Sequence, residues 1–354
     1  MRPLQVKQGK KLSYLMLVLI IAIISLSACG GNGATNSSVK NDGNNVNQDN
    51  TNQPAETPKK LTKVTQVTNW FAQPEHGGQY AALAKGFYEE VGIEMTIMPG
   101  GPQVSSIQQV ASGQVQFGMA QADELLVARN QGIPVVAIAA PFQINPQAIM
   151  FHTEEAIASA SEIGGRTVYI APGAMYWEYL KKAYDLKDFK ELAFTGNFSG
   201  FLTDKRSAIQ SYITSDPYLL KQQGVDVSFI RIHDTGYQPY ANVLFTTEKM
   251  IQENPELVKA YVEASMKGWK YFKDNYEEIN PVIQKENPDL TLESMKSTAE
   301  NEIELIFGGD AKTSGVGIMT SERWTTLAQQ LANIGIIKNT DEVKHVFNTE
   351  FLPK

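Results

Sequence analysis

Short apolar segments recur along the chain from residue 62, separated by stretches with helical spacing. Three segments alternate apolar and polar positions, as half-buried strands do, and a fourth is continuously apolar. The strands are expected at residues 64–68, 93–97, 115–119 and 134–140. The helices between them are expected at residues 78–91, 104–111 and 123–131. This order predicts a doubly wound α/β lobe, and the continuous run predicts a buried strand of the parallel kind.

Further segments follow, of which those between residues 166 and 232 predict another α/β lobe. Strands are expected at residues 148–151, 167–171, 191–195, 207–212, 225–232 and 243–245. Helices are expected at residues 175–184, 219–222, 254–272, 290–307 and 321–334. We expect lobe 1 to comprise residues 62–151 and 243–354, and lobe 2 to comprise residues 152–242. Two crossings between the lobes predict a two-segment hinge with a ligand cleft.

The first 61 residues have the composition of a targeting segment followed by a linker. Four basic residues precede an apolar run at 15–24, which is shorter than the ~20 residues of a spanning helix and typical of a signal peptide. Residues 26–30 (L-S-A-C-G) resemble a bacterial lipobox and contain the only cysteine of the chain. We expect a lipoprotein signal peptide over 1–28, lipidation of Cys29, and a disordered Asn/Gly-rich tether over 29–61. The expected location is the outer face of the cell membrane of a Gram-positive bacterium.

Composition narrows the class of protein. Hydrophobic residues make up 42% of the 354 residues, too many for a chain that is disordered throughout. A single cysteine excludes a disulfide-stapled miniprotein. The formal net charge of −7 gives no indication of a nucleic-acid face, and we expect no nucleic-acid partner.

Motifs for catalysis are missing from the sequence. Residues 196–200 (G-N-F-S-G) have the wrong spacing for a nucleophile elbow, and neither a P-loop nor a dinucleotide-binding glycine motif occurs. His152, His233 and His345 lack metal-ligand spacing. We therefore expect no catalytic residue, no metal and no cofactor, and a protein that is not an enzyme.

Several motifs resemble those of a known family of binding proteins. Residues 69–78 (N-W-F-A-Q-P-E-H-G-G) and 84–88 (A-K-G-F-Y) are similar to the W-x-P-N-x-x-H-x-G…A-x-x-K-G opening of thiamine-pyrimidine precursor binders. Residues 111–118 and 132–136 resemble the A-x-G-x-x-D-F-G and G-x-P-V-V motifs of the same group, and residues 246–269 resemble its N-P-containing helix motif. The chain is identified on these motifs as a member of the nitrate/taurine/sulfonate group of ABC-transporter binding proteins, whose fold the fungal thiamine-pyrimidine synthases share.

The resemblance implies a fold and a function. The fold would be that of a type II periplasmic binding protein, and the protein a monomeric, lipid-anchored solute receptor of an ABC importer. It would close its lobes on a small molecule, with a thiamine-precursor pyrimidine or similar heterocycle as the first choice, and deliver it to a permease with its ATPase subunit. Residues 71–74 (F-A-Q-P) depart from the Pro-Asn of the pyrimidine binders. The alternatives are an aliphatic sulfonate, taurine or nitrate receptor and a ligand sensor without transport.

Candidate ligand-binding residues are those expected at strand ends and in the first turns of the following helices, where ligands bind in open α/β sheets. Aromatic side chains there favour stacking on a flat heterocycle, with core packing as the alternative for Trp70, Phe71 and Tyr80 and contact with the hinge as the alternative for Tyr237. The aromatic candidates are Trp70, Phe71, Tyr80, Phe142, Tyr176, Trp177 and Tyr237. Because lysine and arginine are scarce at these strand ends, a heterocycle is expected ahead of an anion.

The other candidates are polar or backbone groups. Glu75 and Asp216 are the acidic acceptors for an aminopyrimidine, and helix capping is the alternative for Asp216 and for Asp123. His76 corresponds to the motif histidine, with a structural hydrogen bond as its alternative. Most of the remaining candidates are chosen for free N–H groups at helix N-termini, and Gly173 is chosen because glycine lets a ligand approach the backbone closely. This set comprises Asn69, Glu75, His76, Gln121, Ala122, Asp123, Gln143, Gly173, Met175, Ser215 and Asp216.

Overall fold

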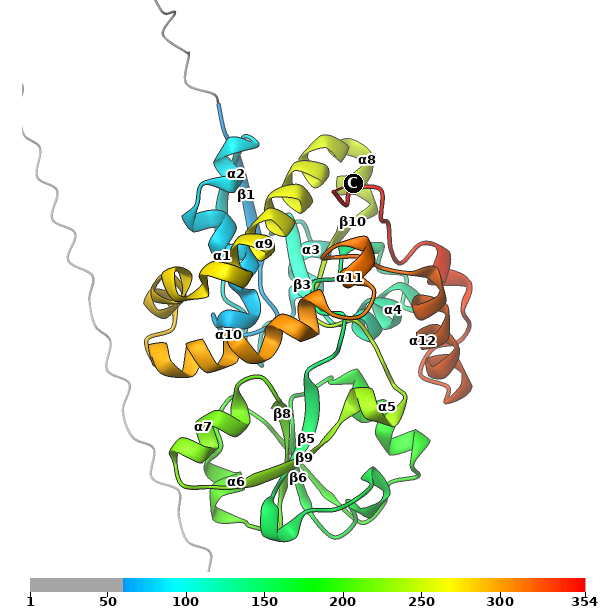
Figure 1. Ribbon diagram of the computed structural model, residues 1–354. Coiled ribbons are helices and arrows are strands. Elements are labelled where there is room, and N and C mark those ends of the chain that lie inside the picture. The colour runs from blue at the N-terminus through cyan, green and yellow to red at the C-terminus, as the bar shows by residue number, and fades with distance from the viewer. Residues whose placement is uncertain (1–59, 354) are drawn as a thin grey trace, which may run out of the picture. The chain divides into compact units, whose positions relative to one another are not determined.

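The computed structural model describes residues 60–353, which form two α/β lobes, each around its own five-stranded sheet (Figure 1). Lobe 2 is the green part of the ribbon, whereas lobe 1 combines the blue and cyan segments with the yellow to red ones. The predicted signal peptide, Cys29 and all but the last two residues of the predicted tether lie outside the described residues. No helix within residues 60–353 is long and apolar enough to cross a membrane.

Lobe 1 contains a mixed sheet with the strand order β2-β1-β3-β10-β4. Its strands are β1 (Thr62–Val67), β2 (Ile93–Met98), β3 (Phe117–Ala120), β4 (Val135–Ala139) and β10 (Val243–Thr247). Its main helices are α1 (Gly77–Ala84), α2 (Phe87–Glu90), α3 (Ser106–Ala111), α4 (Ala122–Asn130), α8 (Glu248–Glu253), α9 (Pro255–Glu286), α10 (Leu292–Phe307), α11 (Ala311–Ser314) and α12 (Ser321–Asn333). Strand β1 runs parallel to β2 and β3, whereas β10 is antiparallel to both of its neighbours.

The expectation that residues 134–140 form a strand of the parallel kind is wrong. Strand β4 forms its ladder with β10, which returns from lobe 2 and inserts antiparallel between β3 and β4. The other edge of β4 is covered by the C-terminal segment, because Ala137 donates to the carbonyl of Val346 and accepts from Asn348 N–H, both at 2.8 Å. All five residues of β4 are therefore buried, which explains the continuous apolar run.

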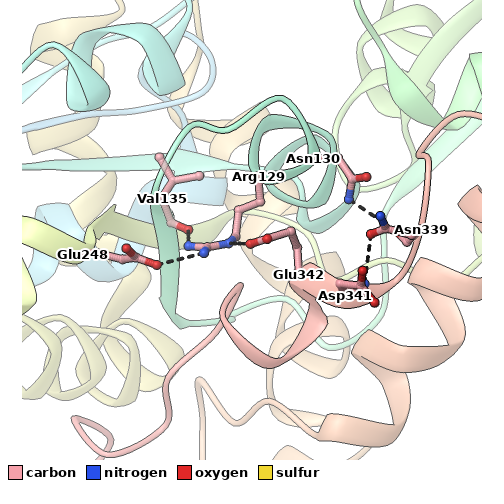
Figure 2. A network of polar contacts seen from close by, with 7 residues as sticks. All are labelled: Arg129, Asn130, Val135, Glu248, Asn339, Asp341 and Glu342. Carbon is pink, nitrogen blue, oxygen red and sulfur yellow. Dashed lines mark hydrogen bonds and ion pairs between the residues drawn. The ribbon is translucent and has the colours of Figure 1, made fainter.

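Arg129 ties this C-terminal segment to lobe 1 (Figure 2). Its guanidinium, 7% exposed, donates from Nε to Glu342 and from Nη2 to Glu248, both at 2.8 Å, and from Nη1 to the carbonyl of Val135. Three separate chain segments thus converge on one buried cation. A buried guanidinium is stable only when such partners satisfy its fork of N–H groups.

Lobe 2 contains the second sheet, with the order β7-β6-β8-β5-β9. Its strands are β5 (Gln147–His152), β6 (Thr167–Ile170), β7 (Lys190–Ala193), β8 (Ala208–Tyr212) and β9 (Val227–Arg231), and its helices are α5 (Met175–Ala183), α6 (Ser199–Thr203) and α7 (Asp216–Gln222). The expectation that the strand at 148–151 belongs to lobe 1 is wrong, because β5 forms antiparallel ladders with β8 and β9. The chain therefore enters lobe 2 before residue 147 rather than near residue 152.

The helix expected over residues 78–91 is interrupted. Helix α1 ends at Ala84, and Gly86 adopts a left-handed conformation with φ of 70° before α2 begins. Glycine reaches this region without the steric cost that a Cβ imposes. The break lets α1 lie against the long helix α9, where a Cβ on Gly78 would meet the ring of Trp269 at 2.3 Å.

Candidate ligand-binding site

A cavity of about 710 Å³ lies between the two lobes. Lobe 1 contributes residues that follow β1 and β3, together with parts of α3 and α4. Lobe 2 contributes residues that follow β6, β7 and β8. The cavity therefore lies beyond the carboxyl ends of parallel strands from both sheets, where open α/β folds bind ligands.

Aromatic rings from both lobes gather at this cavity. Trp70 and Phe71 follow β1, and their rings meet edge to face with centroids 5.6 Å apart. Phe194 and Phe198 come from lobe 2, and Phe194 lies parallel to Trp70 across the junction. Tyr176 lines the cavity from the first turn of α5. These rings offer flat apolar surface to a planar ligand.

Five neutral side chains form a hydrogen-bonded row along the cavity, which we call the polar floor: His76, Asn69, Asn242, Tyr212 and Gln121. Nε2 of His76 lies 3.1 Å from Oδ1 of Asn69, whose Nδ2 donates to Asn242 at 2.9 Å. The hydroxyl of Tyr212 donates to the same oxygen of Asn242 at 3.2 Å, and Gln121 donates to Tyr212 at 2.9 Å. The floor links lobe 1 to lobe 2 through the residue just before β10.

The charges at the cavity are acidic. Within the part of the chain that the structure describes, no lysine or arginine lines this cavity, whereas Glu124, Asp216 and Asp289 do. Burial lowers the pKa of His76 to about 3, so its ring is neutral at physiological pH. The site therefore contains no positive side chain that would pair with an anionic ligand.

The surroundings of two of these carboxyl groups raise their pKa into the range of physiological pH. Burial raises the pKa of Asp216 to about 7, while its carboxylate accepts the N–H of Tyr212 at 2.7 Å. Burial and the neighbouring Asp123 raise the pKa of Glu124 to about 8, while Glu124 accepts the N–H of Gln121 at 3.0 Å. Both groups can therefore accept a hydrogen bond or, when protonated, donate one.

Comparison with known families shows to which family the chain belongs. Residues 73–279, more than half of it, match the family described as NMT1/THI5 like. The chain belongs to the NMT1/THI5-like family. The family resemblance expected from the motifs is thereby confirmed.

Relatives of this NMT1/THI5-like protein include both binding proteins and enzymes. The riboflavin-binding protein RibY of Chloroflexus aurantiacus is 26% identical, covering 83% of this chain and 87% of its own. The formylaminopyrimidine-binding protein of Halalkalibacterium halodurans is 23% identical, covering 75% and 83%. The 4-amino-5-hydroxymethyl-2-methylpyrimidine phosphate synthase of Legionella pneumophila is also 23% identical, covering 82% and 93%. Family membership alone thus does not decide between capture and catalysis.

Solved structures confirm the expected fold. The periplasmic aliphatic sulphonate-binding protein SsuA of Escherichia coli superposes with a TM-score of 0.61 at 13% identity, covering 84% of this chain and 95% of its own. The fold is that of a type II periplasmic binding protein, with two mixed five-stranded sheets. At this identity the likeness concerns the fold alone.

More than half of the residues singled out from the sequence line the cavity of this NMT1/THI5-like chain. They are Asn69, Trp70, Phe71, His76, Gln121, Gly173, Met175, Tyr176, Ser215 and Asp216. They lie in the segments that connect a strand to the following helix or in the first turn of that helix, which brings distant parts of the chain to one edge. Their role toward a ligand stays a prediction.

The structure places the other candidates away from the cavity. Tyr80 is buried in the core of lobe 1, Phe142 packs edge-on against Trp269, and Trp177 donates to Glu191 at 2.8 Å. All three rings belong to the buried core, as the core-packing alternative for Tyr80 predicts.

Polar groups among the remaining candidates are likewise engaged in internal contacts. Asp123 accepts from the hydroxyl of Tyr237 at 2.8 Å, and Ala122 donates its N–H to a backbone carbonyl. Gln143 donates to two backbone carbonyls, and Glu75 accepts from Thr214 at 2.7 Å. These contacts hold the four residues within the protein, although Oε2 of Glu75 and Oε1 of Gln143 are buried without a hydrogen-bond partner.

Among the cavity residues that were not predicted from the sequence, three contribute to the rings and the polar floor: Tyr212, Phe194 and Asn242. Tyr212 is the last residue of β8, so the strand-end criterion applied elsewhere points to it as well. Phe194 follows β7 in the same way. Asn242 comes directly before β10, at the expected return crossing, so a criterion based on the ends of strands does not select it.

Proposed function

We propose that this protein is the extracytoplasmic solute-binding lipoprotein of an ABC importer, which closes two lobes on a small heterocycle and delivers it to the permease. The observation that carries the proposal is the cavity between the lobes, where rings and neutral amides gather without a lysine or arginine among the described residues. The lipid anchor rests on the lipobox at Cys29 and the importer on the family resemblance.

The cavity favours a heterocycle that is neutral or positively charged. Sulfonate and nitrate ions need cationic or densely donating surroundings, whereas this site has carboxyl groups at Glu124 and Asp216. An aminopyrimidine of the thiamine-precursor type offers ring faces to Trp70 and N–H groups to these acceptors. The formylaminopyrimidine-binding relative supports this choice.

A flavin is the second candidate. The cavity of about 710 Å³ falls in the range of pockets that enclose drug-sized ligands and exceeds what a single ring fills. The relative at 26% identity is named as a riboflavin-binding protein. A tricyclic ring system with a hydroxylated chain would use both the rings and the neutral polar side chains.

Capture is favoured over catalysis by the cysteine content. The fungal synthases carry a Cys-rich motif, whereas the single cysteine of this chain lies in the lipobox. A role as a sensor without transport would keep the same cleft. Uptake of a labelled ligand by cells with and without the protein separates the two roles.

The first experiment is a thermal-shift and calorimetry series on the purified protein with 4-amino-5-hydroxymethyl-2-methylpyrimidine, riboflavin, taurine and nitrate. A ligand at 100 times its dissociation constant stabilises the folded state by about 2.7 kcal/mol. Stabilisation by the pyrimidine or the flavin alone is the expected result. Stabilisation by taurine or nitrate alone would contradict the heterocycle assignment.

A further inference from the structure

The polar floor has a fixed direction of hydrogen bonding, and its starting point is a backbone carbonyl. Nδ2 of Asn242 lies 2.9 Å from the carbonyl oxygen of Glu75, which can only accept. The amide of Asn242 must therefore turn its nitrogen toward Glu75 and its oxygen toward the floor. The carbonyl of Glu75 thus fixes which end of the Asn242 amide is the nitrogen and which is the oxygen.

The direction propagates along the row on both sides of Asn242. Oδ1 of Asn242 accepts from Asn69 Nδ2 at 2.9 Å, so Oδ1 of Asn69 faces His76. Because that oxygen can only accept, His76 must carry its proton on Nε2, which leaves Nδ1 as an acceptor. On the other side the hydroxyl of Tyr212 donates to Asn242 and accepts from Gln121 Nε2.

What remains without a partner along the floor is a pair of acceptors. Nδ1 of His76 and Oε1 of Gln121 are buried and have no hydrogen-bond partner in the protein. Both residues line the cavity, and Gln121 also donates its backbone N–H to the carboxyl group of Glu124 at 3.0 Å. A buried acceptor without a partner is costly, and a donor on a ligand would relieve that cost.

We infer that Asn242 is the positioning residue that makes the polar floor an acceptor surface, so that the site selects ligands carrying N–H or O–H donors at their ring edge. A site built in this way rejects an analogue without the donor, because its own polar groups then stay unpaired. The statement about ligands rests on the proposed function, whereas the statement about the direction of the floor does not. Asn242 also has a φ of 49°, a conformation that asparagine tolerates better than most residues.

The test uses Asn242→Gly in the full-length protein, because glycine accepts this φ and removes only the side chain. Nitrogen-15 NMR of the His76 ring, without ligand, is expected to show one tautomer with the proton on Nε2 in the wild type. The Gly variant is expected to show a mixture of tautomers. A proton on Nδ1 in the wild type, or an unchanged spectrum in the variant, would overturn the role of Asn242.

Calorimetry then tests selectivity with 4-amino-5-hydroxymethyl-2-methylpyrimidine and its analogue with hydrogen in place of the 4-amino group. Riboflavin and 3-methylriboflavin form the second pair. The wild type is expected to prefer the N–H donor of whichever pair binds by about tenfold or more, and Asn242→Gly to lose most of that preference. Equal affinity of the wild type for both members of a pair would refute the acceptor surface.

Two further variants separate positioning from stability. Asn242→Asp loses the donor to the carbonyl of Glu75, but its carboxylate still accepts from Asn69 and Tyr212, so it should keep the wild-type tautomer of His76 that the Gly variant loses. Asn301→Ala is the matched control, because Asn301 also bridges the lobes, through the carbonyl of Thr214 at 3.2 Å, but lies outside the cavity. An altered His76 spectrum in Asn301→Ala would assign the effect to the lobe junction as a whole. If no probe binds, the ligand of the proposed function fails, while the His76 spectra still decide the role of Asn242.

Discussion

The ring of Trp70 in lobe 1 lies parallel to the ring of Phe194 in lobe 2, with 6.0 Å between their centroids and 5° between their planes. The two residues are 124 positions apart and belong to different sheets. Both rings line the cavity, so their contact joins the two lobes at the place where a planar ligand would stack. Ligand stacking and the contact between the lobes therefore involve the same two rings.

Replacement of Trp70 by alanine should weaken ligand binding by about 1–3 kcal/mol, because it removes the larger stacking surface. Isothermal titration calorimetry with the pyrimidine or flavin that the wild type binds measures the loss. Phe229→Ala is the control, since this ring is 42% exposed on β9 and does not line the cavity. Wild-type affinity in Trp70→Ala would show that the ring serves only the junction.

A methyl group at Gly78 should destabilise lobe 1 by about 1–3 kcal/mol, the usual range for overpacking. The added Cβ would lie 2.3 Å from the ring of Trp269, where α1 crosses α9. Urea denaturation of Gly78→Ala against wild type measures the change. Gly164→Ala should cost much less, because its nearest neighbour lies 3.4 Å away. Equal stability of the two variants would mean that the helices separate at little cost.

The contribution of Asp216 to stability should fall as pH rises. Its pKa is raised from an ordinary value of 3.8 to about 7 by burial, so between these values the folded chain holds a proton that the unfolded chain releases. The free energy of unfolding of wild type relative to Asp216→Asn should decrease between pH 5 and 7, by at most about 1.4 kcal/mol per unit, and level off above. Urea titrations at several pH values measure this difference. A difference that grows with pH would indicate an ionised, paired carboxylate instead.

Loss of the Arg129 side chain should destabilise the protein by about 2–4 kcal/mol, since it leaves Glu248, Glu342 and the carbonyl of Val135 without their partner. Arg129→Ala is compared with Lys63→Ala, whose ion pair with Glu94 is exposed and 3.8 Å long. Denaturation reports stability, and limited proteolysis reports release of the C-terminal segment. Equal effects of the two substitutions would contradict a fastening role for Arg129.

Short apolar segments, three of them alternating, located the strands, because a strand that is buried on one or both faces repeats apolar residues accordingly. They did not reveal partners, and β5 was therefore assigned to the wrong lobe although its position was correct. The continuous apolar run of β4 likewise predicts burial but does not show the direction of the neighbouring strand. Burial on all sides produces that pattern whether the neighbour is parallel or antiparallel.

The cavity was foreseeable where residues follow strands directly. Trp70 and Gln121 satisfy that rule and line the cavity, and Tyr176 lines it from the first turn of the helix that follows β6. The rule could not separate neighbours such as Tyr176 and Trp177, which point to cavity and core one position apart on the same helix. Nor could it foresee that Tyr237 would satisfy Asp123, since that contact joins segments 114 residues apart.

The pairing of β4 with residues 346–348 bears on the order in which the chain acquires its structure. The strands of lobe 2 form one uninterrupted stretch, residues 147–231, whereas lobe 1 needs β10 and the last residues of the chain to finish its sheet and cover its edge. When the chain emerges from its N-terminus, lobe 2 is complete before lobe 1 can be. The edge of β4 therefore stays unpaired until residues 346–348 have been synthesised and have folded onto it. During this time the unpaired edge can associate with strands of other chains.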